Sequence, residues 1–190
     1  MTDTIIGLLR HGQTDWNIDF RLQGTSDIPL NEVGLKQART AAEGISGDWD
    51  VIIASPLSRA LDTAKIVAEF HDLGEVLVEP LLLERSFGEA EGLRYEVWRE
   101  KYPDSHVPGG ETIEALEKRA RRLLDSLAER FPGKRVLTVS HGALIRKLIN
   151  IVSDGEFPRE GERLGNASLT TIAHHSAGWE IETYAPQTIS

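Results

Sequence analysis

Short apolar runs of strand length alternate with longer segments of helical period along most of this 190-residue chain. The runs lie at residues 4–9, 51–54, 76–79, 136–139, 169–173 and 179–184. The helical segments lie at residues 31–45, 58–70, 111–131 and 143–152. Because alternating strands and helices connect through right-handed crossovers, the pattern predicts a mostly parallel sheet between two helical layers. We therefore expect an α/β fold, a three-layer α/β/α sandwich.

Local sequence signals mark the boundaries of several of these elements. In the segment 111–131, apolar residues recur in steps of three and four, and Thr112 is a suitable N-cap. Asn31 is expected to cap the helix that begins after it. The last two strands are separated by "HHSAG", which predicts an antiparallel pair at the edge of the sheet. We expect residues 1–190 to form one domain with a small cap around 85–110, and the strand order stays open.

Composition narrows the class of function. The chain carries 21 Lys and Arg against 30 Asp and Glu, and the resulting net charge of −9 argues against a nucleic-acid surface. No apolar run reaches the roughly 18 residues of a membrane span, and the start "MTDTIIGLLR" lacks the basic lead of a signal peptide. The absence of cysteine excludes disulfides and thiolate metal sites. We therefore expect a cytoplasmic protein that binds neither nucleic acid nor membrane.

Reactive side chains follow four of the predicted strands, directly where each strand ends. Arg10 and His11 follow the first strand in "RHG", and Arg59 follows the second in "SPLSRA". Glu84 follows the third strand in "PLLLERSFGEAEG", and His141 follows the fourth in "SHG". Any one of these residues alone would be read as structural or solvated. Because ligands bind beyond the carboxyl ends of parallel strands, the combination indicates a site.

The chemistry of these residue types suits phosphoryl transfer. Arginine offers a planar fork of donors for phosphate oxygens, and the helix that begins after His141 adds backbone donors. Imidazole can attack phosphorus when one ring nitrogen is free and the other is held. A carboxyl group can protonate a leaving alkoxide. Gly12 lets the substrate or a neighbouring backbone approach closely.

Two hydrolase alternatives explain less of the sequence. "TVSHG" approaches the nucleophile elbow of serine hydrolases, with Asp154 and His174 or His175 as the remaining candidates, but it leaves "RHG" unexplained. We interpret His174 and His175 instead as loop or edge residues. A metal hydrolase could use the histidines of "RHG" and "SHG", but the neighbouring arginines would repel a divalent cation.

Six stretches resemble, in order, the motifs of the histidine phosphatase superfamily, the group that includes cofactor-dependent phosphoglycerate mutases. The resemblance runs from about residue 5 to about residue 150. The stretches are "LLRHGQTDWN", "LQGTSDIPLNEVGLKQA", "IIASPLSRALDTA", "LLERSFGEAEG", "PGGET" and "VLTVSHGALIR".

The resemblance implies a role for each of the residues at the strand ends. His11 would be the nucleophile that becomes phosphohistidine. Arg10, Arg59 and His141 would form the phosphate pocket with it. Glu84 would donate a proton to the leaving group.

Further phosphate contacts are implied for Asn17, Gln23 and Gly24, and Gly142 would offer its backbone N–H. The implied mechanism requires neither a metal nor a bound cofactor. The partner would be a small phosphorylated substrate, and a homodimer is one candidate oligomeric state.

The length of the segment between the "ER" motif and "PGGET" bears on whether the protein is a mutase or a phosphatase. The mutases that resemble this chain carry a longer insertion there, whereas only residues 92–107 separate the two motifs here. We therefore predict a phosphatase acting on a small phosphomonoester, with a phosphoglycerate mutase as the alternative. A non-catalytic phospholigand binder would have no use for both a nucleophile and a proton donor. Tyr95, Trp98, Tyr102 and His106 in this segment either line the substrate or pack the cap.

Overall fold

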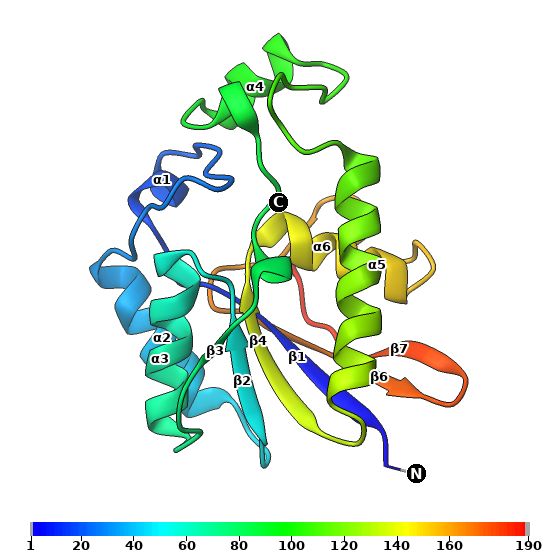
Figure 1. The fold of residues 1–190 in the computed structure, drawn as a ribbon. Coiled ribbons are helices and arrows are strands. Elements are labelled where there is room, and N and C mark those ends of the chain that lie inside the picture. The colour runs from blue at the N-terminus through cyan, green and yellow to red at the C-terminus, as the bar shows by residue number, and fades with distance from the viewer. Residues whose placement is uncertain (1, 189–190) are drawn as a thin grey trace.

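The computed structural model of the protein describes residues 2–188 and is built around a six-stranded sheet (Figure 1). The strand order is β3-β2-β4-β1-β6-β7. The strands β1, β2, β3 and β4 run parallel, and β6 and β7 are antiparallel to their neighbours. The strand bounds are Thr4–Arg10 (β1), Val51–Ala54 (β2), Leu77–Val78 (β3), Arg135–Ser140 (β4), Leu169–His175 (β6) and Gly178–Thr183 (β7).

Helices cover both faces of this sheet, α2 and α3 on one side and α5 and α6 on the other (Figure 1). Along β1, Ile5 and Leu9 pack against the first pair of helices, whereas Ile6 and Leu8 pack against the second. This alternation is the side-chain period of a strand buried on both faces. The helix bounds are Glu32–Gly44 (α2), Ser58–Phe70 (α3), Ile113–Arg130 (α5) and Gly142–Val152 (α6).

The predicted α/β sandwich with an antiparallel edge is therefore confirmed. The predicted caps are present as well, because Thr112 Oγ1 accepts the N–H of Ala115 at 3.1 Å and Asn31 Oδ1 accepts that of Gly34 at 2.8 Å. The strand expected at residues 76–79 is shorter and covers only Leu77–Val78.

Short elements that the sequence pattern did not predict lie near the carboxyl ends of the strands. The helix α1 (Asp15–Ile18) is one turn closed by a capping box between Thr14 and Asn17. The helix α4 (Tyr95–Lys101) lies in the cap, and β5 (Glu162–Arg163) pairs with β8 (Gln187–Thr188) in a separate two-stranded sheet. The 3₁₀ turns are η1 (Pro80–Leu82) and η2 (Gly88–Ala90).

The cap expected around residues 85–110 has its own small apolar cluster of Phe87, Ala90, Trp98 and Val107. It lies above the carboxyl ends of the parallel strands (Figure 1). Within residues 2–188, no helix is both long enough and apolar enough to cross a membrane.

Candidate active site

His11 directly follows β1 and is almost completely buried, with 2% of its surface exposed. Its backbone is fixed on both sides, because its N–H donates to Ser140 O and its carbonyl accepts the N–H of Ala167, each at 3.1 Å. The ring Nδ1 lies 2.6 Å from Gly12 O, which can only accept. Nδ1 therefore carries the hydrogen, and the neutral ring presents the lone pair of Nε2.

The charge state of this ring is set by its surroundings. Burial, followed by the charges of Arg10 and Arg59, lowers the pKa of His11 well below its usual value. The ring is therefore neutral at neutral pH, and its free nitrogen can act as a nucleophile.

His141 follows β4, and its ring centroid lies 5.2 Å from that of His11. Burial also lowers the pKa of His141 well below its usual value, followed by the repulsion that a protonated His11 would exert and by the charge of Arg59. Its Nε2 lies 2.7 Å from Ser55 Oγ, which accepts the backbone N–H of Leu57 and can donate its own hydrogen to the ring. In that tautomer Nδ1–H is the free donor of His141.

Arg59 lies in the first turn of α3 and is fully buried. Two of its nitrogens are held by backbone carbonyls, with Nη1 2.6 Å from Ser26 O and Nη2 2.7 Å from Gly24 O. Burial lowers the pKa of Arg59 to about 10, so the group stays a cation at neutral pH. Arg10 is held similarly, with Nη1 2.6 Å from Leu164 O.

The pocket contains donors that the protein itself does not satisfy. Among the side chains of residues 2–186, five buried polar atoms lack a hydrogen-bond partner, and three of them are Arg10 Nε, Arg59 Nε and His141 Nδ1. An unmet buried donor is costly, so unmet donors at one site indicate a ligand that accepts hydrogen bonds. Gly142 begins α6 beside them, and a Cβ there would lie 3.3 Å from Arg10 Nε.

Glu91, which the sequence motifs did not single out, anchors the loop that holds Arg59. Its Oε1 accepts the N–H of Ser26 at 3.0 Å and the Ser26 hydroxyl at 2.6 Å. Its Oε2 accepts the N–H groups of Thr25 at 3.2 Å and Phe87 at 3.0 Å. The loop and the cap therefore meet on one carboxylate.

Gly24, which the sequence predicted as a phosphate contact, belongs to this loop. Its φ of +52° suits glycine, and a Cβ there would lie 2.2 Å from Glu91 Oε2. Its carbonyl accepts a hydrogen bond from Arg59 Nη2. The contact that the structure shows for Gly24 is therefore with the arginine that would bind the phosphate.

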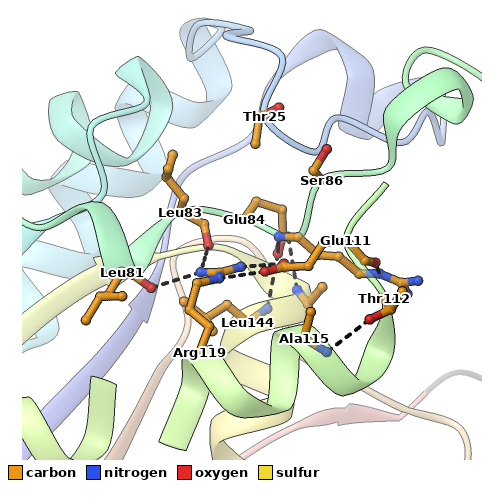
Figure 2. Close-up of polar contacts among 12 residues, drawn as sticks. Thr25, Leu81, Leu83, Glu84, Ser86, Glu111, Thr112, Ala115, Arg119 and Leu144 are labelled. Atoms are coloured by element: carbon orange, nitrogen blue, oxygen red, sulfur yellow. Dashed lines mark hydrogen bonds and ion pairs between the residues drawn. The ribbon is translucent and has the colours of Figure 1, made fainter. Parts of the chain in front are cut away.

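Glu84 follows η1 and its carboxylate lies at the start of α6 (Figure 2). Oε2 accepts the N–H of Ala143 at 3.0 Å, and Oε1 accepts those of Leu144 at 3.1 Å and Arg85 at 2.8 Å. A carboxylate has about four acceptor positions, so roughly one remains for a proton. His141, the N-cap residue, makes no side-chain cap bond, and Glu84 takes that place.

The serine of "SHG" is structural in this arrangement. Ser140 is fully buried, and its hydroxyl donates to Leu82 O at 2.7 Å. His175 ends β6, and its Nε2 lies 3.3 Å from the carboxylate of Glu180 on β7. His174 pairs with Thr4 of β1 and with Trp179 of β7, so β6 is an inner strand and the interpretation of its two histidines as loop or edge residues is wrong.

Asn17, Gln23 and Gly12 pack the loop after β1. Asn17 Oδ1 accepts the N–H of Thr14 at 2.9 Å, and Gln23 Oε1 accepts the Thr14 hydroxyl at 2.8 Å. A Cβ on Gly12 would lie 2.4 Å from Gly34 O, so this glycine permits the approach of the α2 backbone. The amide N–H₂ groups of Asn17 and Gln23 are the parts left to contact a phosphate, and that role stays a prediction.

The cap aromatics divide between packing and exposure. Trp98 is 8% exposed and its ring lies 5.7 Å from that of Phe87, so it packs the cap. Tyr95 is 44% exposed, and Tyr102 packs against the edge of the same cluster.

A neutral histidine beside Arg10 and the buried Arg59, beyond the carboxyl ends of a parallel sheet, defines an enzyme that moves phosphoryl groups. The chain belongs to the histidine phosphatase superfamily (branch 1), whose sequence model matches residues 6–186.

Individual relatives agree with that membership. An uncharacterized phosphatase PhoE of Bacillus subtilis is 40% identical over 95% of this chain and 94% of its own. A probable phosphoglycerate mutase GpmB of Proteus mirabilis is 34% identical over 93% of this chain and 90% of its own. The solved structure of a mycobacterial glucosyl-3-phosphoglycerate phosphatase in complex with VO3 is 31% identical, with a TM-score of 0.81 over 95% of this chain and 98% of its own. With its phosphatase-named relatives, the chain is a phosphoric monoester hydrolase.

Proposed function

We propose that the protein hydrolyses a small phosphomonoester through a phosphohistidine formed on His11. The observation that carries this proposal is the ring of His11, which is neutral and held at Nδ1 by Gly12 O at 2.6 Å. The unmet donors of Arg10, Arg59 and His141 lie around it. A nucleophile and the receptors for phosphate oxygens are therefore present together.

In the first step, His11 Nε2 attacks phosphorus and forms an N–P bond while the ester P–O bond breaks. Arg10, Arg59, His141 and the N–H of Gly142 receive the phosphoryl oxygens. The ring becomes positive, and its Nδ1–H bond to the Gly12 carbonyl stabilises that charge. A protonated Glu84 gives its proton to the leaving alkoxide, which departs as an alcohol.

In the second step, water attacks the phosphohistidine. Glu84, now ionised, accepts the proton that the water loses. The N–P bond breaks, inorganic phosphate leaves and His11 returns to its neutral form. The same residue thus serves as acid and then as base.

Transfer to water distinguishes this proposal from a mutase. The short segment 92–107 and the phosphatase names of two of the relatives support water as the acceptor. The name of the mycobacterial relative makes phosphorylated glycerate derivatives the first esters to test. We further propose that the chain acts as one domain of this superfamily, since both helical layers pack on one sheet.

A panel of phosphomonoesters assayed for phosphate release, with phosphoglycerate mutase activity measured in parallel, tests the proposal. We expect release from at least one ester and none from the His11→Ala variant. Isomerisation of phosphoglycerate that exceeds hydrolysis would favour the mutase. Tight binding of phosphate by calorimetry without any hydrolysis would favour a binding protein.

A further inference from the structure

Arg119 on α5 is a partly buried cation outside the phosphate pocket, and all three nitrogens of its guanidinium are bonded to three other residues. Its Nε and Nη2 lie 2.8 and 2.7 Å from the two carboxylate oxygens of Glu111. Its Nη1 donates to Leu81 O at 2.9 Å and Leu83 O at 2.7 Å. Figure 2 shows the arginine between the Glu111 carboxylate and these carbonyls. The arrangement is a bidentate pair that also binds backbone.

The carbonyls held by Arg119 belong to the residues just before Glu84. The carbonyl between them, Leu82 O, accepts the Ser140 hydroxyl at 2.7 Å. Side chains from α5 and β4 thus fix three consecutive peptide groups ahead of Glu84. Such groups in a loop would otherwise depend on water for their partners.

Glu111 holds the residues on the other side of Glu84. Its N–H donates to Ser86 O at 2.8 Å, and its carbonyl accepts Nε of Arg85 at 3.0 Å. Arg119 therefore binds the backbone before Glu84, and Glu111 binds the backbone after it. The two side chains are mostly shielded from solvent, which strengthens the pair relative to one on the surface.

We propose that Arg119, anchored by Glu111, is a positioning residue that sets the place of the Glu84 carboxyl group relative to the leaving group. The inference rests on the proposed role of Glu84 as proton donor. A displacement of about 1 Å in a reacting group can cost about 100-fold in rate, so a grip on the adjacent backbone matters for catalysis. Arg119 itself touches neither the substrate nor His11.

The Arg119→Lys variant tests this inference, because it keeps the positive charge but loses the planar fork. We would measure kcat and KM on an alkyl phosphate and on p-nitrophenyl phosphate, whose leaving group needs little protonation. We expect kcat on the alkyl ester to fall by about 10- to 100-fold and kcat on the aryl ester by less than about threefold, with similar KM values. Glu111→Gln should give the same split in a milder form.

The matched control is Arg121→Lys, on the same helix, where the arginine pairs with Glu117 on the surface. It should leave both rates unchanged. Adding Arg119→Lys to Glu84→Gln should cause no further loss on the alkyl ester, because both changes act on one proton transfer.

Equal losses on the two esters in Arg119→Lys and Glu111→Gln would overturn the inference and leave a purely structural pair. The Glu84→Gln variant separates this failure from that of the mechanism. If Glu84→Gln itself shows no split between the esters, Glu84 is not the proton donor and the premise fails. If it shows the split and the Arg119 and Glu111 variants do not, only the positioning role fails.

Discussion

Replacing Glu91 by glutamine should weaken phosphate binding, although Glu91 does not belong to the pocket. Its carboxylate accepts four hydrogen bonds of 3.2 Å or shorter from Thr25, Ser26 and Phe87. The carbonyls of this loop hold the guanidinium of Arg59. Loss of the carboxylate should therefore misplace the arginine.

The size of the effect follows from the hydrogen bonds that glutamine cannot accept. One carboxylate oxygen becomes an N–H₂ group, so two of the four donors lose their acceptor. At about 1 kcal/mol for each hydrogen bond of a half-buried group, the two lost bonds destabilise the ordered loop conformation by about 2 kcal/mol. If most of this loss reaches Arg59, the affinity for inorganic phosphate should fall about tenfold, which equals about 1.4 kcal/mol.

Calorimetric titration with inorganic phosphate measures this directly, and thermal melting reports the cost to the fold. Glu89→Gln is the matched control, because this exposed residue lies in η2, which Glu91 directly follows in the chain, and loses the same charge. An unchanged phosphate affinity in Glu91→Gln, together with a lower melting temperature, would refute the link between the loop and Arg59.

Three further predictions concern pH, the buried serine and the proton donor. Because the folded state lowers the pKa of His11 and His141, the unfolded chain binds more protons below about pH 6.5. The free energy of unfolding should therefore fall from about pH 7.5 to pH 5.5, by up to about 1.4 kcal/mol per pH unit for each histidine, as urea titrations can show. Ser140→Ala should lower the free energy of unfolding by about 1–3 kcal/mol, because Leu82 O loses its hydrogen-bond donor. The variant should keep phosphatase activity within about tenfold. Complete loss of activity in a folded Ser140→Ala variant would favour a serine nucleophile. Glu84→Gln should lose roughly 10²–10⁴-fold on alkyl phosphates and much less on p-nitrophenyl phosphate, and equal losses would show that Glu84 only binds.

Features that depend on neighbouring residues along the chain could be predicted from the sequence. The cap at Thr112 is an example, because a side-chain oxygen three residues before a free N–H is a local signal. The strand ends are another, since apolar runs stop where the polar motifs begin. Parallel topology then brought Arg10, His11 and His141 to one edge of the sheet.

Features that depend on tertiary contacts could not be predicted in this way. Arg119 stands among other arginines in "KRARR", and only the packing of α5 against η1 distinguishes it. Glu91 is one of two glutamates in "GEAEG", and its role depends on a loop some 65 residues earlier. The pairing of β5 with β8 joins two-residue strands that carry no periodic signal of their own.

The account as a whole depends on the transfer of a phosphoryl group to His11. Quenching turnover of a substrate that carries labelled phosphate, in acid and in alkali, measures this step directly. The account predicts a labelled protein that is stable in base and labile in acid, absent from the His11→Ala variant. Undiminished hydrolysis by that variant, or a label that survives acid and is lost in base, would contradict it.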